Sequence, residues 1–130
     1  MHKGNTLIEM LIAVALAFMP LMGSAVGIGH IDRDGSWFYI YDETGRRITS
    51  FSRTRGELQG YSSEFIILKS GSWYYLYDAH GRRINSLSVS HIGEILSVGR
   101  DTFTSRSGSW IYTWSKDGRR LASRAAHTVK

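Results

Sequence analysis

The sequence contains no cysteine, and its single proline, Pro20, lies near the N-terminus. Without cysteine the chain forms no disulfide bonds, so its domain depends on packing and strand pairing for stability. The sequence also lacks a nucleophile elbow, a glycine-rich phosphate loop and a close histidine pair at metal-ligand spacing. The histidines are scattered along the chain: His2, His30, His80, His91 and His127. We therefore expect no enzymatic activity, no cofactor and no metal site.

Charged residues are missing from Met10 to Gly29. In helical form a run of about twenty residues spans roughly 30 Å, the thickness of a bilayer's hydrocarbon core. About a hundred residues remain beyond it, enough for one domain with a modest core. The chain carries a net charge of +5. A basic surface suits anionic partners such as DNA or cell-wall polymers, but it is also common on inert surfaces.

The residues before the apolar run carry a processing pattern. Lys3 and Gly4 are followed by Asn5 and then by the run Thr-Leu-Ile that ends at Glu9. This segment resembles the prepilin leader of type IV pilins and type II secretion pseudopilins. The resemblance implies that a prepilin peptidase cuts after Gly4 and that the new N-terminus on Asn5 is methylated. It also implies that Glu9 pairs with the N-terminal amine of a neighbouring subunit, which would compensate a carboxylate buried in the membrane.

An ordinary secretory signal peptide is the alternative to the prepilin interpretation. Lys3 would then belong to a short basic region, and the small residues Gly23, Ser24 and Ala25 would form a cleavage site before Val26. Glu9 argues against this alternative, because a carboxylate inside the apolar run costs insertion free energy.

Beyond residue 30 the chain repeats itself. The step Gly-Ser-Trp occurs at Gly35, Gly71 and Gly108, and the three stretches that contain it, 34–52, 70–88 and 107–125, align throughout. The pairs Gly56-Glu57 and Gly93-Glu94 both precede the next Gly-Ser-Trp step by the same number of residues. A period of 36 to 37 residues is typical of a repeat architecture in which each unit is one supersecondary element.

The signals within each unit are those of β-structure. Asp34-Gly35 is a hairpin-turn pair, the run of aromatic residues after it favours a strand, and Asp42 to Gly45 suits a second turn. We expect an N-terminal membrane α-helix followed by an all-β domain, an antiparallel meander of hairpin repeats. The meander would be partial-propeller-like or an open roll of about eight strands, because a closed propeller needs at least four blades.

The expected boundaries follow from these patterns. The leader covers residues 1–4, the hydrophobic helix 5–29 and the β-rich domain 30–130, with units at about 34–69, 70–106 and a truncated 107–125. The units also resemble YD repeats through Tyr41-Asp42 and Tyr77-Asp78. They are similar to the hairpins of choline-binding cell-wall modules through Gly71 to Tyr75.

An arginine pair recurs at one point of each unit. The six residues are Arg46, Arg47, Arg82, Arg83, Arg119 and Arg120. Neighbours on a strand point to opposite faces, so one arginine of each pair could line a common face and bind a polyanion beside the repeated tryptophans. The alternative is that the tryptophans form the core and the arginines stack on aromatic rings or pair with the turn acids.

Two hypotheses for function follow. In the first, the chain is a minor-pilin-like or pseudopilin-like subunit in the bacterial inner membrane, with its domain outside the cytoplasm and with other pilin-like subunits as partners. In the second, it is a surface module that recognises DNA or cell-wall glycan through its hairpin repeats and is exported by an ordinary signal peptide.

Overall fold

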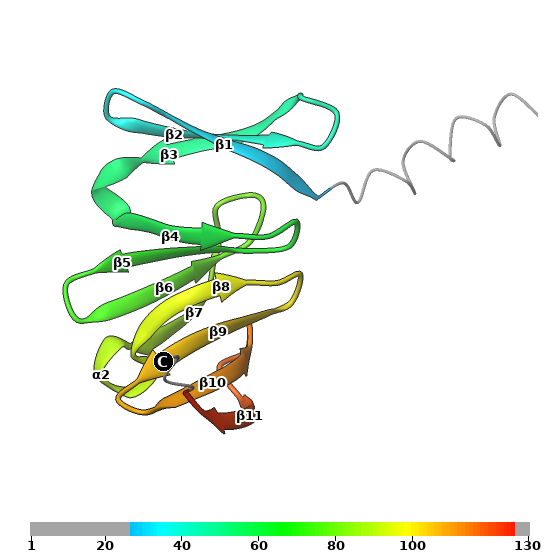
Figure 1. The fold of residues 1–130 in the computed structure, drawn as a ribbon. Coiled ribbons are helices and arrows are strands. Elements are labelled where there is room, and N and C mark those ends of the chain that lie inside the picture. Colours follow the sequence, from blue (N-terminus) through cyan, green and yellow to red (C-terminus); the bar gives the residue numbers. More distant parts are fainter. Residues whose placement is uncertain (1–26, 127–130) are drawn as a thin grey trace, which may run out of the picture.

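The computed structural model describes residues 27–126, and this part of the chain is an all-β domain of antiparallel sheets. The first sheet contains β1 (Ile28–Asp34), β2 (Trp37–Asp42) and β3 (Arg47–Ser52). The second contains β4 (Glu57–Tyr61), β5 (Ile66–Ser70), β6 (Trp73–Tyr77) and β7 (Arg83–Ser88). The third contains β8 (Glu94–Val98), β9 (Thr102–Ser107), β10 (Trp110–Ser115) and β11 (Arg120–Ala125). Within each sheet the strands pair in chain order, and the three sheets are stacked one below another in Figure 1.

The all-β expectation is confirmed for the described residues, but the details differ from the sequence-based prediction. There are eleven strands rather than about eight, and the truncated last unit belongs to a complete four-stranded sheet, whereas the first sheet has three strands. The sequence repeat begins at a hairpin turn inside a sheet, whereas β4 and β8 begin their sheets. The residues of β8 favour a strand by themselves, whereas β4 has few β-forming residues and depends on its pairing with β5.

The predicted helix boundary at Gly29 is also wrong. Ile28 and Gly29 belong to β1, which pairs with β2 from Ile28 opposite Asp42 onward. The rest of the predicted helix and the leader lie outside the described residues. No helix within residues 27–126 is long and apolar enough to cross a membrane.

The Gly-Ser-Trp steps form the turns between β1 and β2, β5 and β6, and β9 and β10. Asp34 pairs with Trp37, so the two loop residues are Gly35 and Ser36, one position later than the sequence pattern predicts. Gly35 has φ of +61°, while no residue other than glycine has positive φ in the described part of the chain. A positive φ at the first loop position alone defines a type II′ turn, which matches the natural twist of the strands.

Each sheet has two faces, which point in opposite directions along the stack. Side chains alternate along a strand, so Phe38 and Ile40 lie on one face of the first sheet, and Tyr39 and Tyr41 lie on the other. We call the first the forward face, because it packs on the next sheet along the chain, and the second the rear face.

The core consists of two layers, each formed by a forward face and the rear face of the following sheet. The first layer contains Phe38, Ile40 and Phe51 of the first sheet with Ile66, Leu68 and Tyr77 of the second. The second layer contains Ile67, Tyr74 and Leu76 of the second sheet with Phe103 and Trp114 of the third, together with Phe65 and Ile92. The second sheet is therefore covered on both faces.

An equivalent hydrogen bond joins the end of the last strand to the Gly-Ser turn within each sheet. Just after β3, β7 and β11, the amides of Arg53, Val89 and Ala126 donate to the carbonyls of Ser36, Ser72 and Ser109 at 2.8, 2.9 and 2.7 Å. Two short helical turns, η1 (Arg53–Arg55) and α2 (Val89–Ile92), then lead into the next sheet.

Ion pairs join the second sheet to the third. Glu64 lies 2.9 Å from Nζ of Lys116 and 3.1 Å from Nε of Arg100. The hydrogen bond from Lys116 lowers the pKa of the Glu64 carboxyl. These contacts fix the loop before β5 against the far ends of the third sheet's strands.

The two faces at the ends of the stack are more polar than the faces inside it. On the forward face of the third sheet, Thr104 and Thr113 replace the Ile and Leu residues of the second, and Arg124 replaces Leu87. On the rear face of the first sheet, Asp32 replaces Leu68. Polar outer faces are typical of the terminal units of a repeat protein.

Candidate binding surface

The arginine pairs follow a turn that has the same geometry in the first two sheets. The Asp42 carboxylate accepts hydrogen bonds from the amides of Thr44 and Arg46, both at 2.9 Å, and Asp78 accepts from His80 and Arg82 at the same distance. In the third sheet Ser115 takes this role and accepts from the amide of Arg119 at 3.2 Å. A hydroxyl therefore replaces the carboxylate where the Tyr-Asp pattern is lost.

Hydrogen bonding also sets the ionisation of the first turn. The side-chain hydrogen bond from Thr44, reinforced by the amide of Arg46, lowers the pKa of Asp42. The turn thus carries a stable negative charge directly beside the arginine pair.

The second arginine of each pair stacks on a tyrosine of the neighbouring strand. The guanidinium carbons of Arg47, Arg83 and Arg120 lie 5.6, 5.3 and 5.1 Å from the ring centroids of Tyr39, Tyr75 and Tyr112. These distances are those of cation–π contacts. The structure therefore has the aromatic stacking that the sequence left as an alternative for these residues.

The first arginine of each pair is exposed. Arg46, Arg82 and Arg119 stand at the end of the turn, at the same end of the outermost strand in each sheet. Arg82 lies 3.5 Å from Asp78 in a loose ion pair. The three arginines therefore hold the same position in each sheet; the row that the sequence predicts for them stays a prediction.

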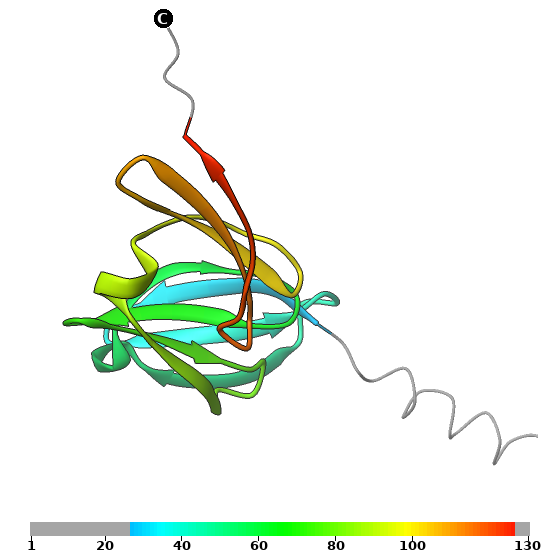
Figure 2. The same ribbon diagram turned by 90° about the horizontal axis from the view of Figure 1, so that it is seen from below.

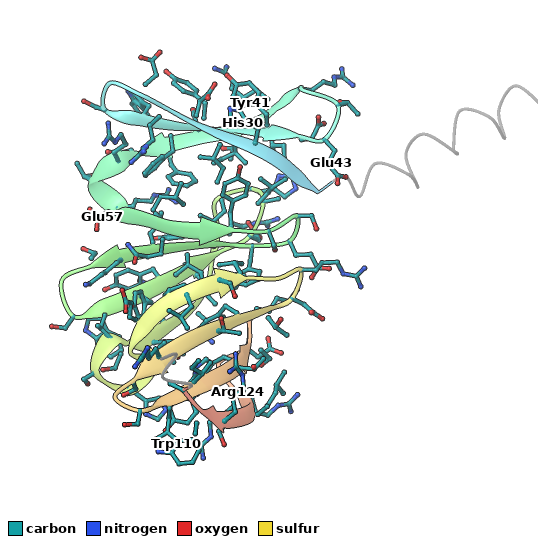
Figure 3. All side chains as sticks on the ribbon, in the orientation of Figure 1. His30, Tyr41, Glu43, Glu57, Trp110 and Arg124 are labelled. Carbon is teal, nitrogen blue, oxygen red and sulfur yellow. The ribbon has the colours of Figure 1, made fainter. Side chains whose placement is uncertain are left out.

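The repeated tryptophans do not form the core. Trp37, Trp73 and Trp110 are 46%, 45% and 48% exposed, whereas Trp114 is buried. Each exposed tryptophan is the first residue of the strand next to the last one in its sheet, β2, β6 or β10; Trp110 is labelled in Figure 3. We call these three residues the tryptophan row.

The tryptophan row and the arginine pairs lie at opposite ends of the strands, contrary to the proximity expected from the sequence. Trp37 pairs with Ser52 at the end of β3, while Arg47 pairs with Tyr41 at its beginning. Four strand residues separate these ends by about 13 Å. The repeat period places both features in every unit, but only strand pairing decides which end each one occupies.

Arg33 and Arg53, which the sequence does not indicate as binding residues, lie closer to the tryptophan row. Arg53 of η1 donates to the carbonyl of Gly35 at 2.8 Å, and its guanidinium lies 5.8 Å from the ring centroid of Phe38. Together with Arg33 and Glu57 it borders an open hollow of about 480 Å³ beside the first hairpin turn. η1 lies outside the repeated pattern, so no spacing signal identified Arg53.

A second hollow, of about 490 Å³, lies on the rear face of the first sheet. Arg33, Arg47, Tyr39 and Tyr41 line it together with Asp32 and Asp34. The two carboxylates balance the two arginines, so this hollow does not present the concentrated positive charge that a polyanion needs. Gly4, Asn5 and Glu9, the predicted processing and assembly residues, lie outside the described part of the chain.

No protein-family model and no curated protein matches this chain. Among solved structures it is similar to one described as "KlHsv2 with loop 6CD replaced by a Gly-Ser linker", with a TM-score of 0.50 and 14% identity. The likeness covers 71% of this chain and 32% of that one, so the chain spans about a third of that structure's length. At this identity the likeness concerns the fold alone.

Proposed function

We propose that this chain is an exported, membrane-anchored interaction protein of the minor-pilin-like or pseudopilin-like kind. The observation that carries the proposal is Gly4 followed by the run that ends at Glu9, directly before twenty residues without charge. On this proposal residues 5–26 anchor the chain in a bacterial inner membrane, and the stacked sheets are displayed outside the cytoplasm. Prepilin peptidase and other pilin-like subunits are then its processing and assembly partners.

The mature N-terminus tests this proposal. Mass spectrometry of the chain purified from its membrane is expected to find a methylated N-terminus on Asn5. Glu9→Ala is expected to leave cleavage after Gly4 intact while abolishing co-purification with other subunits, because the N-terminal amine loses its partner. Glu57→Ala, which removes an exposed carboxylate from the β-domain, is the matched control and should change neither. A mature chain that starts at Val26 would contradict the proposal and favour an ordinary signal peptide.

A second candidate function is the recognition of an extended polymer, DNA or cell-wall glycan, by the displayed domain. The tryptophan row favours it. Each stacked sheet exposes about half of an indole at the same position. Exposure of so much apolar surface to water costs free energy, and such surfaces mark binding sites. Stacked sheets are about 10 Å apart, so the row offers regularly spaced platforms to a chain of bases or sugar rings. We also propose that the stack is a partial propeller, which would place the row along one rim.

Binding titrations separate the two polymers. Single-stranded DNA and purified cell-wall glycan are titrated against the protein, with tryptophan fluorescence as the signal. Each substitution Trp37→Ala, Trp73→Ala or Trp110→Ala is expected to weaken binding by about 1–2 kcal/mol, the scale of one lost stacking contact.

Leu121→Ala serves as the control, since Leu121 is as exposed as the tryptophans but lies outside the row. Strong weakening by salt, together with a loss on Arg46→Gln, Arg82→Gln and Arg119→Gln combined, identifies DNA as the ligand. Binding that salt leaves unchanged identifies a neutral glycan. Failure to bind either polymer would contradict this second function without affecting the first.

A further inference from the structure

The two outer faces of the stack are equivalent in position to the faces that pack on one another twice inside the molecule. Phe51 on the forward face of the first sheet packs on Tyr77 of the second with ring centroids 5.8 Å apart. It also covers Gly81, where an added Cβ would lie 3.1 Å from the Phe51 ring. Leu87 covers Gly118 of the third sheet in the same way, at 2.8 Å.

The equivalent place on the first sheet is open. Gly45 occupies the turn position of Gly81 and Gly118, and an added Cβ there would meet nothing within 4 Å. At the other end of the stack, Arg124 occupies the position of Phe51 and Leu87, since it pairs with Ile111 as they pair with Phe38 and Tyr74. Arg124 is exposed.

A third interface of the same kind would bring these two ends together. Tyr41 holds the position of Tyr77, and Glu43 holds that of Ala79, which packs against the first core layer. The guanidinium of Arg124 would therefore meet the Tyr41 ring and the Glu43 carboxylate, a cation–π contact and an ion pair. Figure 3 shows Arg124 at one end of the stack and Tyr41 and Glu43 at the other, so one molecule cannot make this contact alone.

The charges of the two ends are complementary. Asp32, Asp34 and Glu43 lie exposed at the rear face of the first sheet, while Arg106 and Arg124 project from the forward face of the third. Each face also carries charge of the other sign: Arg47 lies on the first, where Arg33 also borders the hollow, and Glu94 lies on the third. Opposite charges in excess on two surfaces of one molecule favour head-to-tail contact between copies.

We propose that the occupant of both outer faces is a second copy of this chain. The forward face of each third sheet packs on the rear face of the partner's first sheet. Two copies supply six sheets, which lies within the range of four to eight that closes a propeller, so two such contacts close a ring. The contact between two copies is polar, whereas the two interfaces inside each molecule are apolar. The two copies therefore associate reversibly.

Disulfide trapping tests the proposal in the full chain, because the native sequence contains no cysteine. The double variant Glu43→Cys/Arg124→Cys is oxidised gently in its membrane and examined on non-reducing gels. We expect a covalent dimer as the end product, since each closed ring makes two disulfides. The second sheet separates the two cysteines of one chain, so a bond within the chain is excluded.

The matched control is Asp117→Cys/Arg124→Cys, which has the same number of exposed thiols with both on the third sheet. It should remain monomeric. A charge swap adds an independent readout: Glu43→Arg is expected to weaken dimerisation about tenfold, and Glu43→Arg/Arg124→Glu to restore it. Circular dichroism melting of each variant establishes that it is folded.

Three results would overturn the proposal. If the Glu43/Arg124 cysteine pair forms no more dimer than its control, a second copy does not occupy these faces. A ladder of trimers and longer species excludes the closed ring. A dimer that Glu43→Arg does not weaken excludes the predicted contact of Arg124 with Glu43.

Discussion

At the scale of single residues, one buried serine decides how the third sheet packs. Ser105 is fully buried, its hydroxyl donates to the carbonyl of Ile92 at 2.6 Å, and it accepts from Nε1 of Trp114 at 2.9 Å. The equivalent residue of the second sheet is Leu68, beside Tyr77. The small serine makes room for the larger indole and satisfies its N–H, which a leucine would leave unpaired.

Replacement of this serine is expected to destabilise the fold. Ser105→Ala leaves the Trp114 N–H and the Ile92 carbonyl without partners inside the core, at a cost of about 1–3 kcal/mol. Urea unfolding followed by tryptophan fluorescence measures the loss. Ser123→Ala on exposed β11 should change stability by less than about 0.5 kcal/mol. Equal stability of Ser105→Ala and the native chain would show that the hydrogen bonds contribute nothing.

At the scale of secondary-structure elements, the sequence predicts hairpins better than it predicts sheets. The repeats at Gly35, Gly71 and Gly108 locate these hairpins because turn chemistry is local. The strand suggested by Glu94 to Val98 is confirmed as β8, whereas β4 was not identified, because Glu57–Tyr61 acquires its conformation from pairing with the next strand. The arginine pairs were found by the same local pattern, but their distance from the tryptophan row depends on strand direction, which the pattern does not contain.

The repeated Gly-Glu pairs, whose role the sequence did not reveal, mark the entry into each four-stranded sheet. An added Cβ on Gly93 would lie 2.3 Å from the carbonyl oxygen of Arg106, and one on Gly56 would lie 2.7 Å from that of Lys69. Both glycines also have positive φ, +92° and +150°. Glycine is thus required here by the close approach of the neighbouring strand as well as by backbone conformation.

Two alanine substitutions separate these causes. Gly108→Ala meets only the strain of its φ of +60° in open space, about 1–2 kcal/mol. Gly93→Ala adds the clash with the Arg106 carbonyl, and we expect a total loss of about 2–5 kcal/mol. Thermal and urea unfolding of both variants gives the comparison. Similar losses for the two would mean that strand approach at Gly93 carries no cost.

At the scale of the whole molecule, the stack is expected to be most stable at its centre. The second sheet is covered on both faces, and Ile66, Ile67, Leu68 and Leu76 are fully buried, whereas every residue of β11 is exposed. The view in Figure 2 shows β10 and β11 crossing the first two sheets at an angle, which leaves β11 with few neighbours outside its own sheet. Local opening follows such differences in burial.

Hydrogen exchange and a pair of leucine substitutions test this gradient. Amides of β5 and β6 are expected to exchange slowest and those of β11 fastest, because β11 opens without disturbing either core layer. Leu76→Ala, at a fully buried site, should cost about 2–5 kcal/mol. Leu121→Ala, at a side chain 51% exposed, should cost less than about 0.5 kcal/mol. Uniform protection across the three sheets would instead mean that the stack unfolds as one cooperative unit whose outer faces are covered, as the proposed ring of two copies would cover them.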